Sequence, residues 1–71
     1  MATQGTHFWF MTIQTPTTGG FHIRDFSGTI SPSRGRTRFD LFNELRKKVT
    51  EVDPKTEHGT VIAFDIQPNK L

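Results

Sequence analysis

The sequence contains no cysteine, and no Asp, Glu, Lys or Arg occurs between Met1 and Ile23. The lack of cysteine excludes disulfides, cysteine-based zinc sites and thiol catalysis, and it fits a reducing compartment. No apolar run approaches the roughly 18 residues that a membrane-spanning helix needs. The start, residues 1–6, lacks the positively charged region of a signal peptide. We therefore expect a cytoplasmic protein that has no membrane segment.

Patterns that carry enzymatic chemistry are also missing. His7, His22 and His58 do not have the spacing of metal ligands. No serine lies in a Gly-x-Ser-x-Gly elbow, and the glycines fit neither the dinucleotide-binding nor the P-loop pattern. Asp40 and Glu44 share one helix face, where a like-charged i,i+4 pair is more often solvated than catalytic. We expect a non-enzymatic protein without catalytic residues, metal, cofactor or small-molecule substrate.

Aromatic side chains are abundant, with 7 Phe and 1 Trp among 71 residues. A chain of this length forms one domain, residues 1–71, and buries only about 60% of the surface that its unfolded form exposes. Each Phe or Trp buries about 150–250 Å², so a few of them can supply much of the core.

Three segments have the composition of strands. Residues 7–15 are aromatic and β-branched, are apolar on both faces, and are followed by Pro16. Residues 21–30 form the second segment, in which Gly28 predicts a bulge or bend. Residues 60–67 form the third. We place its Ile62, Phe64 and Ile66 on one face and its Val61, Ala63 and Asp65 on the other.

One helix is predicted over residues 38–52. Thr37 is suited to the N-cap, and Asp40 stands three residues later in the capping-box position. The segment Asp53-Pro54 ends the helix, because the residue before a proline avoids the α region. The apolar residues recur at helical spacing. They are Phe39, Phe42, Leu45, Val49 and Val52, with Leu41 widening the stripe.

The element order predicts an α+β fold, ββαβ, whose three-stranded sheet has the strand order 2-1-3 and one helix packed on one face. Closure of the hairpin by Thr15 and Phe21 would place Phe26, Arg24 and His22 on the same sheet face as the first strand's even-numbered residues. Which face meets the helix stays open. The uncovered face keeps large apolar groups, which soluble monomers rarely expose as one patch. The candidate interface residues are Phe8, Phe10, Phe26 and Arg24.

Two kinds of partner fit such a face. Burial against another protein chain is favoured, and the simplest case is a homodimer, because a two-fold contact needs only one self-complementary patch. The alternative is single-stranded nucleic acid, whose bases stack on aromatic side chains beside basic groups.

A second candidate site is the basic stretch before the helix. Arg34, Arg36 and Arg38 occupy alternate positions next to a helix N-terminus, where phosphate binds readily. Lys47 and Lys48 are further candidate phosphate contacts. The alternative function is therefore a small nucleic-acid-binding protein, and a solvated loop explains the same residues.

Segments along most of the chain resemble a known group of sequences. They are Gly28-Thr-Ile-Ser-Pro32, then Thr37-Arg-Phe-Asp-Leu-Phe42 at the start of the helix, and the ending Gln67-Pro-Asn-Lys-Leu71. This frame resembles small actinobacterial proteins of unknown function. The resemblance implies the ββαβ order in a complete natural protein that ends at Leu71. It implies no function and no functional residue.

Overall fold

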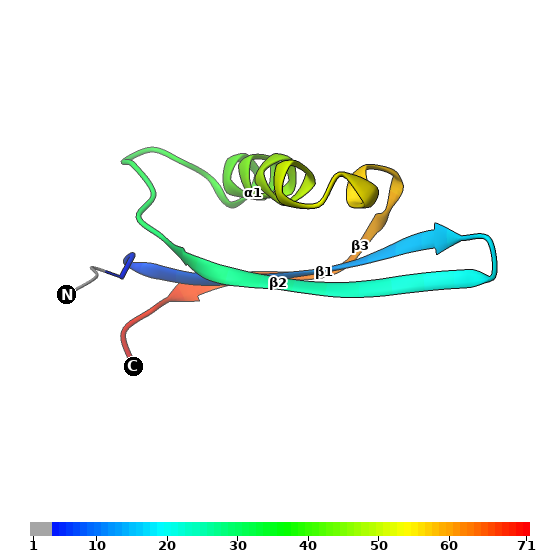
Figure 1. Ribbon diagram of the computed structural model, residues 1–71. Coiled ribbons are helices and arrows are strands. Elements are labelled where there is room, and N and C mark those ends of the chain that lie inside the picture. The colour runs from blue at the N-terminus through cyan, green and yellow to red at the C-terminus, as the bar shows by residue number, and fades with distance from the viewer. Residues whose placement is uncertain (1–3) are drawn as a thin grey trace.

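The computed structural model describes residues 4–71, which form one antiparallel sheet covered on one face by a helix (Figure 1). The strand order is β2-β1-β3, which confirms the predicted α+β, ββαβ fold. Within these described residues, no helix is both long enough and apolar enough to span a bilayer. The elements are β1 (His7–Thr17), β2 (Gly20–Ile30), α1 (Arg38–Val52), the short 3-10 helix η1 (Pro54–His58) and β3 (Thr60–Pro68).

Helix α1 starts at a complete capping box. The Thr37 hydroxyl accepts a hydrogen bond from the Asp40 backbone N–H at 3.1 Å, and the Asp40 carboxylate accepts one from the Thr37 N–H at 3.1 Å. Two donors at the helix N-terminus are thereby satisfied. The hydrogen bond that the Asp40 carboxylate accepts from the Thr37 backbone N–H is the largest cause that holds the pKa of Asp40 below its ordinary value, and a hydrogen bond from the Thr37 side chain lowers it further. The helix bounds coincide with the predicted range 38–52.

The core lies between α1 and the face of the sheet that carries the odd-numbered residues of β1. Seven hydrophobic residues are buried there: Trp9, Met11, Ile13, Leu41, Leu45, Val49 and Ile66. Phe42 packs at the margin, where its ring meets the Phe64 ring edge-to-face with centroids 5.1 Å apart. The first strand is therefore the central strand and supplies three of the seven buried side chains.

The predicted apolar stripe of α1 is wrong at both ends. Phe39 is 72% exposed and Val52 is also exposed, whereas Leu41, Leu45 and Val49 form the buried row. A helix turns about 100° per residue, so Phe39 lies about 200° away from Leu41 around the axis. The row with i,i+4 spacing faces the sheet, and Phe39 faces solvent.

The hairpin is longer than predicted. β1 continues through Pro16 to Thr17, and β2 already begins at Gly20, whose φ of 146° favours glycine. Pro16 lies beyond Gln14, the last β1 residue that pairs with β3. No third strand needs an N–H from β1 at that position, so the proline is tolerated there.

This longer hairpin shifts the register of β2 by one residue. Phe21 pairs with Pro16 instead of Thr15, and a shift of one residue moves every side chain of a strand to the opposite face. Phe26 pairs with Met11 and Arg24 pairs with Ile13, so both lie on the face that carries α1. The prediction that Phe26 and Arg24 share a face with Phe8 and Phe10 is therefore wrong. In their place, the register turns Phe21 and Ile23 to the other face.

The bulge predicted near Gly28 lies elsewhere. Gly28 stays in register opposite Trp9, and a Cβ atom there would lie 3.3 Å from the Trp9 indole nitrogen. The glycine thus leaves room for the indole ring. The irregularity is in β3, where consecutive β1 residues pair with Ala63 and Val61 and Ile62 is the extra residue.

The bulge in β3 changes which residues of that strand face the helix. Val61 packs against the core, although the sequence predicted that it faces away from Phe64 and Ile66. Ile62, which was predicted to share their face, is 50% exposed. An inserted residue reverses the alternation of side chains on one side of the insertion, and this explains both errors.

The packing of α1 predicts a contrast between two of its apolar residues. Leu45→Ala removes a side chain that is 2% exposed, and we expect it to lower the free energy of unfolding by about 2–5 kcal/mol. Phe39→Ala removes an exposed ring, and we expect a change within about 0.5 kcal/mol. Urea denaturation of both variants measures the difference. Similar losses in the two variants would contradict the orientation of the helix.

Candidate functional site

The sheet face that points away from α1 is the candidate site, and we call it the open face. Figure 1 shows α1 on one side of the sheet, whereas the other side carries no helix or strand of residues 4–71 and only the C-terminal end of the chain runs there. Six large apolar side chains are exposed on this side or at its β3 margin: Phe8, Phe10, Phe21, Ile23, Ile62 and Leu71. Phe8 and Phe10 keep 43% and 37% of their surface exposed although they belong to the central strand. These two residues lie where the sequence placed the candidate interface.

The register arranges the open face in rows that cross the three strands. Each row has one residue from β2, one from β1 and one from β3. The rows are Thr29–Phe8–Gln67, Ser27–Phe10–Asp65, Asp25–Thr12–Ala63 and Ile23–Gln14–Thr60. The charged side chains in these rows are Asp25 and Asp65, and none of the rows contains a lysine or an arginine.

Both carboxylates of the open face have partners within the chain. Asp25 accepts a hydrogen bond from the Thr12 hydroxyl at 2.8 Å. Asp65 lies 3.2 Å from the Arg38 guanidinium, which reaches it from the start of α1, and it accepts a hydrogen bond from the Gln67 amide at 2.7 Å. The face is thus apolar at Phe8 and Phe10 of the central strand, with compensated carboxylates at its sides.

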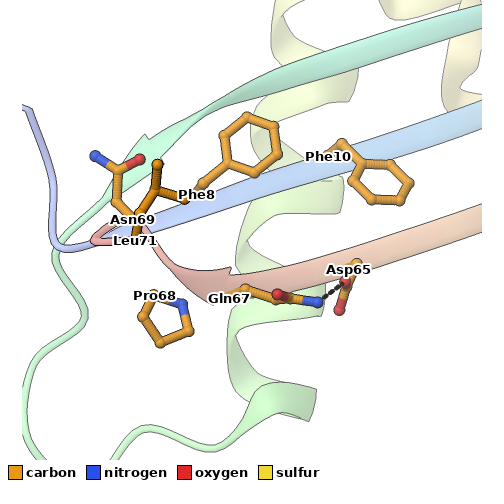
Figure 2. A pocket seen from close by; sticks show the side chains of 7 residues that line it. All are labelled: Phe8, Phe10, Asp65, Gln67, Pro68, Asn69 and Leu71. Carbon is orange, nitrogen blue, oxygen red and sulfur yellow. Dashed lines mark hydrogen bonds between the residues drawn. The ribbon is translucent and has the colours of Figure 1, made fainter.

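A hollow of about 360 Å³ lies beside the two phenyl rings, on the β3 side. Figure 2 shows both rings projecting from β1, on the side of the sheet opposite to the helix. The end of the chain borders the hollow, and its position is fixed by a 2.8 Å hydrogen bond from the Asn69 N–H to the Thr6 carbonyl oxygen. The lining residues are Phe8, Phe10, Asp65, Gln67, Pro68, Asn69 and Leu71.

Arg24 and Phe26, the other two candidate interface residues, have a structural role. The Arg24 guanidinium lies 5.0 Å from the centre of the Phe26 ring and donates a hydrogen bond to the Asp53 carboxylate. Burial acts to raise the pKa of Asp53, but the hydrogen bonds from Arg24 and from the Lys55 backbone N–H outweigh it, so this pKa lies below its ordinary value. The ion pair joins β2 to the junction of α1 and η1.

The basic candidates differ in whether they are paired within the chain. Arg36 pairs with Glu44 and Arg38 pairs with Asp65, so the positive charge of each is compensated within the chain. Lys48 lines a small hollow together with Arg36. Arg34, Lys47 and Lys48 are exposed, and the described residues contain no ion pair to any of these three.

Within residues 4–71, no group of three histidine or carboxylate side chains is placed to hold a metal ion. His22 and His58 do line one hollow of about 390 Å³, together with Lys55, between the hairpin and η1. Sequence spacing could not indicate this grouping, because only the register of β2 turns His22 toward η1.

Comparison with known proteins adds no relative. The chain matches no protein-family model, and neither the curated proteins nor the solved structures contain a significant match to it. The resemblance to small actinobacterial proteins of unknown function therefore stays a prediction.

The Arg24–Asp53 ion pair predicts a stability that depends on pH. Because the folded-state pKa of Asp53 lies below its ordinary value of 3.8, its contribution is present above pH 3.8 and is lost as the pH falls through the lower, folded-state value. We expect Asp53→Asn to lower stability at pH 7 and to reduce the loss of stability on acidification. Thermal unfolding between pH 7 and pH 2.5 measures both effects. Glu51→Gln, which changes an exposed carboxylate of α1, is the control and should follow the wild type.

Proposed function

We propose that this protein is a non-enzymatic interaction module that binds another protein chain through the open face, and that its partner is a second copy of itself. The observation that carries the proposal is the presence of two exposed phenyl rings, Phe8 and Phe10, on the central strand of a sheet face that no described element covers. Burial of apolar surface contributes about 25 cal/mol per Å², so two aromatic side chains per copy supply several kcal/mol.

The charges of the open face favour protein over nucleic acid. Sites that stack bases interleave aromatic side chains with basic groups that contact the phosphates. The rows of the open face carry Asp25 and Asp65 and no basic residue, and the Arg38 guanidinium that reaches the face from α1 is paired with Asp65. The basic groups expected beside the aromatic rings, Arg24 and His22, belong to the helix side of the sheet.

The basic stretch before α1, with Arg34, Arg36 and Arg38, supports the alternative function, nucleic-acid binding, less strongly than the sequence alone indicated. Arg36 and Arg38 each hold a carboxylate of the chain, and phosphate would have to compete with Glu44 and Asp65 for them. Arg34, Lys47 and Lys48 are the candidate contacts that do not face this competition. The absence of cysteine leads us to propose a reducing compartment, the cytoplasm, as the place of action.

Nucleic-acid binding is tested by mobility shift with single- and double-stranded DNA and RNA at low salt. We expect no shift at micromolar protein. A shift whose affinity falls steeply with salt, and falls less steeply after Arg34→Ala or Lys47→Ala, would establish the alternative function instead.

Self-association is tested by sedimentation equilibrium at micromolar concentration. We expect the wild type to sediment at twice the monomer mass and Phe10→Asp to sediment as a monomer, because a carboxylate would be buried without a partner at the centre of the contact. Phe39→Asp is the matched control, since it makes the same change at a ring that is more exposed but lies on α1. It should sediment like the wild type.

Circular dichroism of the two variants shows whether each keeps the fold. A folded Phe10→Asp variant that remains dimeric would exclude the open face as the contact. A wild-type protein that is monomeric throughout the concentration range would exclude self-association.

A further inference from the structure

The register of the open face also indicates how the second copy is oriented. We infer that the two copies are related by a two-fold axis that runs parallel to β1 and lies between the two open faces. This inference rests on the proposed self-association. In this arrangement the hairpins of both copies point the same way, and β2 of each copy lies over β3 of the other. Packed sheets lie about 10 Å apart with their strands nearly aligned, which this arrangement satisfies.

The first reason is the match of the aromatic rows. An axis parallel to β1 maps each row onto itself and exchanges its β2 and β3 ends. Phe8 then lies over Phe8 of the other copy, and Phe10 lies over Phe10. All four rings meet in one apolar cluster along the axis, where each ring is removed from water.

The second reason is the placement of the two carboxylates. Exchange of the row ends puts Asp65 opposite Ser27, whose hydroxyl can donate to it, and puts Asp25 opposite Ala63. Asp25 keeps the hydrogen bond from Thr12 within its own chain. No carboxylate therefore lies opposite a carboxylate, which matters because like charges that face each other in a contact cost several kcal/mol.

The opposite orientation has its axis perpendicular to the strands, and the position of that axis decides which side chains meet. It keeps β2 over β2, so an axis through the Thr12 row sets Asp25 against Asp25. An axis through the Phe10 row sets Asp65 against Asp65. An axis between these two rows avoids both collisions but places Phe10 over Thr12, so the rings no longer meet each other. An axis between the Phe8 and Phe10 rows brings the rings together and sets Asp65 opposite Gln67, but it keeps β3 over β3, so the two hollows of about 360 Å³ face each other and neither is filled. The space around the rings therefore decides between this axis and the parallel one.

The third reason is the space around the two rings. The hollow of about 360 Å³ lies on their β3 side, whereas their β2 side carries the small residues Ser27 and Thr29. In the parallel orientation the small side chains of one copy lie above the hollow of the other. The rings of the two copies thus have room to interleave instead of colliding end to end.

The experiment uses the absence of cysteine, which allows one nitroxide label per chain. Thr18→Cys places the label in the hairpin turn, outside the open face. In the parallel orientation both labels lie at the same end of the dimer, and pulsed dipolar spectroscopy should give a distance of roughly 20–30 Å, set by the sheet spacing and the two linkers. The perpendicular orientation places them at opposite ends, about 40 Å or more apart at a rise of about 3.3 Å per residue.

The outcomes separate this inference from the proposed function. A long distance would overturn the parallel orientation and leave the dimer intact. A lack of dipolar coupling, together with a monomeric mass, would overturn the proposed self-association itself. The control is Thr18→Cys combined with Phe10→Asp, which should lose the coupling; coupling that persists in this variant would place the contact away from the open face.

Discussion

The structure depends on one packing contact, the burial of Trp9, Met11 and Ile13 of β1 against Leu41, Leu45 and Val49 of α1. A single helix is about 10 Å wide and covers one face of a small sheet, and α1 is the one α-helix within residues 4–71, so this contact leaves no α-helix there for the other face. The other face of the same central strand carries Phe8 and Phe10. An apolar central strand with one covered face thus produces both the core and the exposed aromatic surface.

Polar contacts hold the crossover from α1 to β3, where the core ends. Arg46 donates hydrogen bonds to the carbonyl oxygens of Thr56 and Gly59, and Thr56 is itself 2% exposed. A Cβ atom on Gly59 would lie 2.5 Å from the Ile13 side chain, so glycine lets η1 approach the sheet closely. Together with the Arg24–Asp53 pair, these contacts fix α1 over the sheet in a chain too short for a large core.

The sequence was sufficient for features that local chemistry determines and insufficient for those that a pairing partner determines. The capping box of Thr37 and Asp40 marks the start of α1 by itself, and the short hairpin connection with the apolar first strand indicates the order 2-1-3. The register of β2 depends on whether the turn begins after Thr15 or after Thr17, and both choices satisfy turn chemistry. The bulge at Ile62 has no local signal at all.

The same distinction applies to the candidate site. The pairing register of a strand decides which sheet face each of its residues joins. Phe8 and Phe10 were predicted correctly as neighbours because they belong to one strand, where alternation alone decides the face. Phe26 and Arg24 were misplaced because their face depends on the pairing of β2 with β1. The same shift brings Ile23 to the open face and sends the basic groups of β2 to the helix side. The correction therefore makes the open face less basic than the sequence predicted, and this is the physical argument for proposing a protein partner instead of nucleic acid.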